Sequence, residues 1–166
     1  MITLNIPSSA LVVLVGAAGS GKSTFAREHF RATEVLSSDF FRGMVSDDEN
    51  DQETTADAFE LLHLTLEKRL GRGKLCVVDA TNVRAEHRRR LLERARLFAR
   101  PAVAILLETP DAVCVERAAS RATRPVRAEV ILQQWGELKR EFIGSDEGFS
   151  EIFRLRTEDR VEIRRT

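Results

Sequence analysis

The chain has 166 residues, of which 43% are hydrophobic and 31% are charged. This length and composition predict one globular domain with a sizeable core. Lys plus Arg and Asp plus Glu both total 26, so no overall charge draws the chain to nucleic acid or to a membrane, and any polyanion must bind at a local site. No apolar run approaches the length that spans a bilayer, and the two cysteines, Cys76 and Cys114, lack a metal-ligand spacing. The scarcity of cysteines suits a reducing cytosol, and the N-terminal residues show no basic targeting region, so we expect a cytoplasmic protein.

The first predicted elements flank a glycine-rich segment. Residues 2–6 alternate as a short strand, and residues 11–15 form a continuous apolar run, as in a strand buried on both faces of a parallel sheet. Residues 24–30 can form a helix. The segment between them, residues 16–24, matches the pattern G-x-x-x-x-G-K-[ST]. A strand before this pattern and a helix after it are the context in which it forms a phosphate-binding loop.

This loop predicts a site for ATP, or another nucleoside triphosphate, with Mg²⁺. Its glycines let backbone N–H groups surround phosphate oxygens, and the start of the helix adds further donors. The amine of Lys22 is expected to reach the β- and γ-phosphates, and the Ser23 hydroxyl group is expected to bind Mg²⁺. A glycine-rich turn with an accidental lysine is the structural alternative, which the flanking strand and helix disfavour. The predicted nucleotide-binding residues of the loop are Gly16, Gly19, Ser20, Gly21, Lys22, Ser23 and Thr24.

The rest of the chain alternates strands with helices. We predict strands at residues 34–36, 75–78, 103–107 and 152–157, a loop after residue 39, and helices at residues 50–70, 85–99, 109–123 and 126–142. Asn50 and Thr109 are the predicted caps of their helices. Strands separated by helices predict an α/β fold, with a doubly wound, mostly parallel sheet flanked by helices in a single domain over residues 1–166.

Polar residues follow the predicted strands at the edge where such sheets bind ligands. Asp39, opposite the γ-phosphate, can accept a proton from an attacking hydroxyl group, and Arg42 can hold its carboxylate in position. Asp79 ends an apolar strand and is expected to hold Mg²⁺ through water. Ala80 follows it where motor-type ATPases place a glutamate that activates water, which favours transfer to a bound acceptor over hydrolysis. For Asp39, a carboxylate that merely caps a turn is the structural alternative.

Three arginines predict a lid. Arg117, Arg121 and Arg124 are spaced so that a helix would carry all three on one face. Three cations on one face repel one another unless an anion lies there, and the Thr-Arg-Pro-Val segment that follows can act as a hinge. We therefore expect a helical lid, over roughly residues 110–128, that closes on the triphosphate. A solvated basic face is the alternative.

These motifs, taken in order, resemble the 5′-polynucleotide kinase domain of the bacterial polynucleotide kinase–phosphatase family, the RNA end-healing enzymes. The resemblance covers nearly the whole chain and rests on the glycine-rich loop, Asp39 with Arg42, the acidic segment at residues 46–52, the segment at residues 77–83 and the arginine helix. It implies transfer of the γ-phosphate of ATP or another NTP to a 5′-hydroxyl end of RNA or DNA. Asp39 would be the general base, Arg42 an acceptor-side partner, and Arg117 and Arg121 phosphate-binding lid residues that act in catalysis.

Family members usually carry this kinase at the start of a longer chain. The resemblance therefore implies phosphatase and ligase modules, on the same chain or on a partner chain, and an excised domain is one interpretation of the sequence.

Two other functional interpretations stay open. A small-molecule kinase with a nucleoside, sugar or antibiotic acceptor would share the loop, the aspartate base and the lid. A non-catalytic nucleotide-binding switch or interaction module is the alternative from a different class. For a polynucleotide acceptor, the arginine-rich helix at residues 84–100 is a candidate basic surface, with Arg88, Arg89 and Arg90 as the candidate phosphate contacts.

Overall fold

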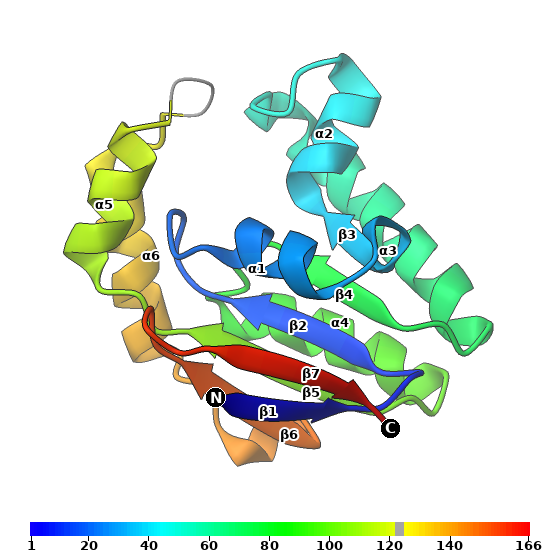
Figure 1. Cartoon of the computed structure of the whole chain (residues 1–166). Helices are drawn as coiled ribbons and strands as arrows, with labels where there is room; N and C mark the ends of the chain where they lie inside the picture. The colour runs from blue at the N-terminus through cyan, green and yellow to red at the C-terminus, as the bar shows by residue number, and fades with distance from the viewer. Residues whose placement is uncertain (122–124) are drawn as a thin grey trace.

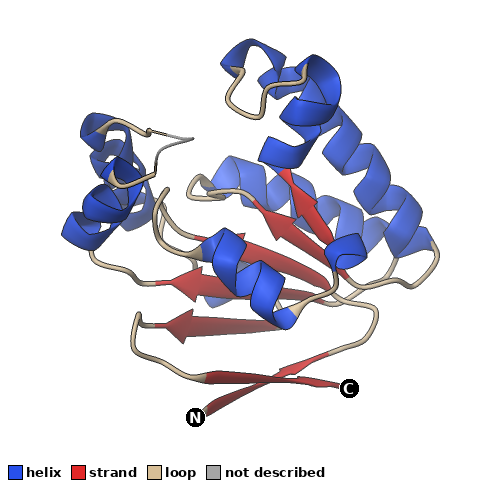
Figure 2. Cartoon of the chain, turned by 45° about the horizontal axis from the view of Figure 1, so that its top comes forward, coloured by secondary structure: helices blue, strands red, loops and turns tan. Residues whose placement is uncertain are grey.

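Five parallel strands form the main sheet, in the order β3-β4-β2-β5-β6. The computed structural model describes residues 1–121 and 125–166, and Figure 1 and Figure 2 show the sheet between helices. Each neighbouring pair in this sheet is parallel, which confirms the predicted doubly wound α/β fold. The strands are β2 (Leu11–Val15), β3 (Val35–Ser37), β4 (Cys76–Asp79), β5 (Ala102–Leu107) and β6 (Glu151–Leu155).

Helices surround this sheet. Within the described ranges, none of them is long and apolar enough to cross a bilayer. Their bounds are α1 (Lys22–His29), α2 (Ser38–Ser46), α3 (Thr55–Gly71), α4 (Ala85–Leu97), α5 (Asp111–Ala119) and α6 (Ala128–Arg140).

The central strand β2 is apolar on both faces, and each face has its own core. Leu11, Val13 and Val15 pack in one cluster with residues of α3 and α4. Val12 and Leu14 point the other way and pack with residues of α1. Side chains alternate along a strand, so a continuous apolar run fills both layers. Figure 1 shows α1 on one side of the sheet and α3 and α4 on the other.

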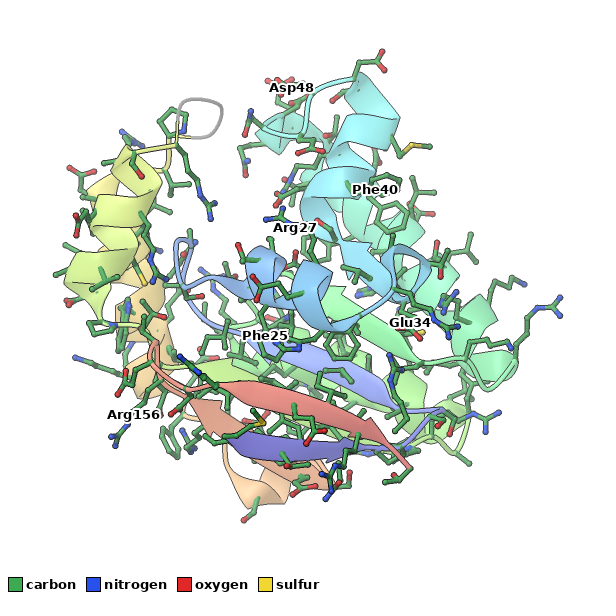
Figure 3. The ribbon with its side chains drawn as sticks, viewed as in Figure 1. Phe25, Arg27, Glu34, Phe40, Asp48 and Arg156 are labelled. Atoms are coloured by element: carbon green, nitrogen blue, oxygen red, sulfur yellow. The ribbon has the colours of Figure 1, made fainter. Side chains whose placement is uncertain are left out.

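A second, two-stranded sheet covers the α1 side of the core. Strand β1 (Ile2–Ile6) pairs in parallel with β7 (Val161–Arg165), a strand that the sequence did not predict. Leu4 and Ile6 pack in the same cluster as Phe25 of α1, which Figure 3 labels between α1 and the sheets. Strand β1 therefore lies outside the main sheet.

Helix α2 occupies the stretch for which the sequence predicts a loop. The Ser37 hydroxyl group caps its start by accepting a hydrogen bond from the backbone N–H of Phe40 at 3.3 Å. Serine, aspartate and glycine in this stretch are typical of turns, so local sequence signals favour a loop. The helix instead packs along α3 (Figure 1), and this tertiary contact stabilises it.

Other helix ends differ from the prediction by several residues. Helix α3 begins at Thr55 because the side chain of Asp51, rather than Asn50, caps a 3₁₀ turn (Gln52–Thr54) that precedes it. Helix α5 begins after Pro110 and ends at Ala119, earlier than the predicted end at residue 123. This early end matters because two of the three predicted lid arginines lie beyond it.

Candidate active site

The glycine-rich loop joins β2 to α1 and folds around the amine of Lys22. The Lys22 Nζ donates hydrogen bonds of 2.8 Å to the carbonyl oxygens of Gly16 and Ala17. Gly21 precedes the helix with a φ of 98°, a left-handed conformation that glycine adopts at little cost. Burial lowers the pKa of Lys22 to about 8, and the nearby Asp79 charge acts in the opposite direction. The loop thus holds a buried amine beside the start of a helix, as a site for an anion requires.

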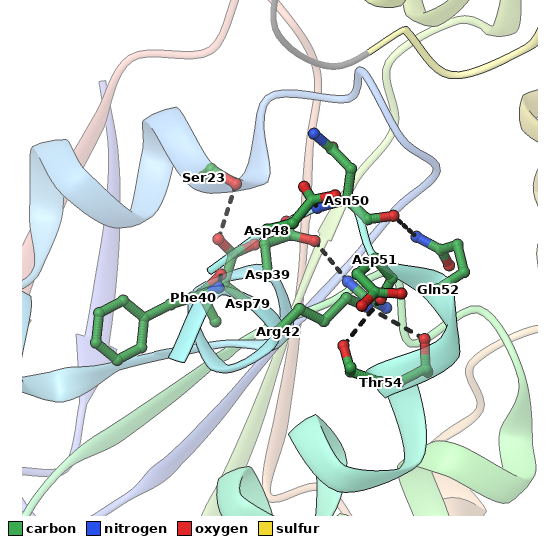
Figure 4. A network of polar contacts seen from close by, with 12 residues as sticks. Ser23, Asp39, Phe40, Arg42, Asp48, Asn50, Asp51, Gln52, Thr54 and Asp79 are labelled. Atoms are coloured by element: carbon green, nitrogen blue, oxygen red, sulfur yellow. Dashed lines mark hydrogen bonds and ion pairs between the residues drawn. The ribbon is translucent and has the colours of Figure 1, made fainter. Parts of the chain in front are cut away.

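The Ser23 hydroxyl group and the Asp79 carboxylate lie together. Ser23 Oγ donates a hydrogen bond of 2.8 Å to Asp79 Oδ2, between the first turn of α1 and the end of β4 (Figure 4). A hydroxyl and a carboxylate oxygen are hard ligands that suit Mg²⁺, which usually keeps several waters and takes further ligands from substrate phosphates. The described residues contain no cluster of three or more His, Cys, Asp or Glu side chains that could hold a metal. With a hydroxyl and a carboxylate oxygen side by side, the Ser23–Asp79 pair fits a cation that takes its other ligands from water and a nucleotide.

Asp39 and Arg42 lie on the first turns of α2, next to the end of β4. Strand register pairs Ser37 with Asp79, which brings the start of α2 to the same sheet edge as the loop. Arg42 Nη1 lies 2.7 Å from Asp39 Oδ1, and Arg42 Nε donates to Thr55 Oγ1 at 3.2 Å. The Arg42 residue is 9% exposed. This buried guanidinium therefore fixes the carboxylate of Asp39 against α3 (Figure 4).

Helix α5 packs directly on the glycine-rich loop. A Cβ added at Gly19 would collide with the backbone carbonyl oxygen of Cys114, so only glycine allows this approach. The guanidinium of Arg117 also reaches the loop, with Nη1 3.6 Å from the position that a Cβ on Gly21 would take. The structure thus brings one predicted lid arginine to the predicted phosphate site.

The prediction that three arginines share one helical face is wrong. Helix α5 ends at Ala119, with Ser120 as its cap, so Arg121 follows the helix. The Ser120 hydroxyl group donates to the carbonyl oxygen of Arg117 at 2.9 Å and competes with continuation of the helix. Burial is the largest effect that lowers the pKa of Lys22, and the charge of Arg121 lowers it slightly further. Arg121 therefore lies close enough to act on Lys22. Arg124 lies outside the described residues.

Two further residues contact the loop, in roles that the sequence did not predict. Gln134 of α6 accepts a hydrogen bond from the backbone N–H of Ala18 at 2.8 Å. Thr109, the predicted helix cap, instead donates its hydroxyl group to the carbonyl oxygen of Ser20 at 2.9 Å. The first contact joins residues 116 positions apart, so no local pattern reveals it. These contacts fix the loop to the α5–α6 side of the molecule.

Arg88 belongs to the interior and not to a basic surface. Its residue is 0% exposed, and its guanidinium forms two hydrogen bonds, of 2.8 and 2.7 Å, with the carboxylate of Glu147. It also donates to the carbonyl oxygens of Asn82 and Val83. The expectation that Arg88 contacts acceptor phosphates is therefore wrong. Arg88 instead positions the segment that follows β4, which lies against the glycine-rich loop through a Gly16 N–H to Thr81 carbonyl hydrogen bond of 3.0 Å.

Known structures share this fold. A protein of Chloroflexus aurantiacus J-10-fl described as a kinase is 19% identical with a TM-score of 0.66, over 92% of this chain and 87% of that chain. The Mycobacterium tuberculosis APS kinase CysC, solved with AMPPNP and APS, is 20% identical with a TM-score of 0.57, over 93% and 92%. A chain of the Pnkp1/Rnl/Hen1 complex is 24% identical with a TM-score of 0.57, over 69% of this chain but 40% of that chain. At these identities the similarity shows the fold.

The sequence comparison shows the family. No curated protein matches the chain at a significant level. A family model described as an AAA domain matches residues 11–144, which include the glycine-rich loop, Asp39, Asp79 and α5. The chain therefore belongs to this AAA domain family and has the fold of P-loop kinases.

Proposed function

We propose that this protein is a 5′-hydroxyl polynucleotide kinase, which transfers the γ-phosphate of ATP or another NTP to an RNA or DNA end. The observation that carries the proposal is the meeting of two pairs at one sheet edge, Ser23 with Asp79 and Asp39 with Arg42. The first pair suits the donor side, with Mg²⁺ and phosphates. The second suits an acceptor hydroxyl group, because a carboxylate held by a buried cation is oriented to accept a proton.

The chemistry assigned to these residues follows from their positions. The loop amides and Lys22 bind the β- and γ-phosphates, while Ser23 and Asp79 would hold Mg²⁺, directly and through water. A bound Mg²⁺ supplies positive charge that neutralises the phosphates. The oxygen of the 5′-hydroxyl group bonds to the γ-phosphorus while Asp39 accepts the hydroxyl proton. The bond between the γ-phosphorus and the oxygen that bridges it to the β-phosphorus breaks, and ADP (or the corresponding NDP) leaves. Arg117 and Arg121 bind the transferring group from a lid formed by α5 and the segment after it.

A polynucleotide acceptor is supported by the ordered set of motifs that resembles the polynucleotide kinase–phosphatase family. The structural similarity to a chain of the Pnkp1/Rnl/Hen1 complex also supports this acceptor. It supports phosphatase and ligase modules as partners as well. A small-molecule kinase is the second candidate, favoured by the similarity to APS kinase over nearly the whole length of both chains. Both candidates use ATP and Asp39 in the same way and differ in the acceptor.

Incubation with γ-labelled ATP, Mg²⁺ and a 5′-hydroxyl oligonucleotide tests the proposal. We expect label on the oligonucleotide, none on a matched oligonucleotide that already carries a 5′-phosphate, and little with Asp39→Asn. Absence of label on the 5′-hydroxyl oligonucleotide, with ATP still bound, would overturn the polynucleotide assignment.

A further inference from the structure

A groove of about 920 Å³ lies between α3 and α4. Phe59, His63 and Glu67 line it from α3, at the four-residue spacing that places them on one helical face. His87 and Arg94 line it from α4. None of these residues belongs to the donor site described above, so the groove requires its own explanation.

The groove begins beside the pair that we assign to the acceptor hydroxyl group. Thr55 lines the groove and accepts the hydrogen bond from Arg42, which in turn holds Asp39. Asn82, three residues after Asp79, lines it near the end of β4. A molecule whose hydroxyl group reached Asp39 would therefore have the groove next to it.

Aromatic rings gather inside the groove. The centroid of Phe59 lies 6.2 Å from that of His63 and 6.4 Å from that of His87. Burial, with the charges of Arg94 and Arg90, lowers the pKa of His63 to about 4. Burial and then Arg84 also lower the pKa of His87. Both shifts favour the neutral imidazole, and the three rings offer stacking surface and hydrogen-bonding edges to another flat ring.

The charges of the groove disfavour a phosphate. Its lining includes Glu53, Glu60 and Glu67 against Arg90 and Arg94. Arg94 is paired with Glu67 at 3.1 Å, and Arg90 with the nearby Glu86 at 2.6 Å. Among the described residues, no ion pair neutralises the carboxylates of Glu53 and Glu60. They would repel a phosphodiester but not an uncharged heteroaromatic base.

We propose that this groove binds one of the two 5′-terminal nucleobases of the acceptor strand, stacked against Phe59 and His87. The inference rests on the proposed function, since it concerns the acceptor of that reaction. It assigns strand recognition to base stacking in the α3–α4 groove, in place of phosphate contacts along the arginines of α4.

Direct binding tests the inference without turnover. Fluorescence anisotropy with a 3′-labelled, 5′-hydroxyl oligonucleotide would give the Kd for the intact strand and for strands abasic at the first or the second position. For the wild-type chain we expect one abasic strand to bind about 5- to 150-fold more weakly, the range for stacking of one base. The test variants are His87→Ala, at an exposed position, and Phe59→Leu, which keeps apolar volume. Each should bind the intact strand as weakly as the wild-type chain binds that abasic strand, and should lose no further affinity for the abasic strand.

His29→Ala is the matched control. The ring centroid of His29 in α1 lies 4.5 Å from that of Phe25, so His29 also packs on a phenylalanine, but it lies outside the groove. It should keep the wild-type difference between intact and abasic strands. The inference is overturned if removing either base does not affect the wild-type chain, or if the groove variants keep the full base effect. Binding is measured without ATP, so the two proposals can fail separately. A base effect that the groove variants lose supports the groove even if phosphate transfer fails. Phosphate transfer without a base effect supports the proposed function and overturns the groove inference.

Discussion

The carboxylate of Asp39 is held by two structural features, the first turn of α2 and the buried guanidinium of Arg42. If it is the general base, Asp39→Asn should lower kcat by about 10²–10⁴-fold, the usual contribution of such a group. The ATP affinity should change little, because a general base acts on the acceptor hydroxyl group and not on the nucleotide. Steady-state kinetics and ATP binding measure the two effects, with Asp47→Asn, exposed at the end of the same helix, as the control. Collapse of ATP affinity with surviving turnover would place Asp39 on the donor side.

The pKa of Lys22 gives nucleotide binding a pH dependence. Burial holds this pKa at about 8 in the free protein, and bound phosphates would raise it by favouring the charged form. Binding should therefore take up a proton at pH values above about 8, and ATP affinity should fall by up to about tenfold per pH unit there. Titration calorimetry at pH 8.5, in two buffers of different ionisation enthalpy, measures the uptake. No proton uptake would mean that Lys22 does not meet the phosphates.

For single residues, the sequence allowed us to predict which polar side chains gather at one sheet edge when they follow a strand. Ser23, Asp39 and Asp79 follow apolar runs, and parallel strands bring such positions to one edge. The sequence did not predict Gln134 or Thr109, because their contacts join the loop to segments far along the chain. Composition cannot indicate which of many polar side chains makes such a contact.

The predicted lid, over roughly residues 110–128, includes α5 and Arg121. A planar guanidinium binds the equatorial oxygens of a transferring phosphoryl group in a way that an ammonium cannot. Arg117→Lys and Arg121→Lys should therefore be nearly as inactive as the alanine variants. Each loss should be smaller than the about 10³–10⁵-fold of a single arginine finger, and the double variant should deviate from additivity. Wild-type kcat/KM in both lysine variants would show that these arginines do not clamp the phosphate.

The contact between α5 and the glycine-rich loop depends on Gly19. Its φ of 82° and the Cys114 carbonyl oxygen both exclude a Cβ, so Gly19→Ala should lower the free energy of unfolding by at least about 1 kcal/mol and weaken ATP binding. Gly136→Ala, within α6, would meet only the flexible Arg140 guanidinium and should stabilise by roughly 0.5–1 kcal/mol. Urea unfolding measures both. Equal effects would mean that the loop tolerates a displaced α5.

Strands with continuous apolar runs and most helices were predicted, whereas α2, which packing against α3 stabilises, was not. Strands β2, β4 and β5 carry such runs, whereas α2 has turn-forming residues and becomes helical beside α3. The early end of α5 depends on a side chain that bonds to its own helix, a competition that periodicity does not reveal.

In the whole molecule, the parallel fold followed from strands alternating with helices, but the strand partners did not. Strand β1 pairs with β7 at the other end of the chain, and no local pattern specifies a partner at that separation. The predicted site does not depend on this pairing, because the glycine-rich loop, the start of α2 and the end of β4 meet at one edge of the main sheet.

The proposed function depends most on the acceptor being the 5′ end of a polynucleotide. The most direct test is kcat/KM for phosphate transfer from ATP to a series of 5′-hydroxyl acceptors, from a nucleoside through a dinucleotide to longer strands. A polynucleotide kinase should show a steep rise in kcat/KM from the nucleoside to the oligonucleotide, because a strand offers contacts beyond its first nucleotide that a nucleoside lacks. Equal kcat/KM for the nucleoside, or transfer to a sugar or another small molecule alone, would contradict it.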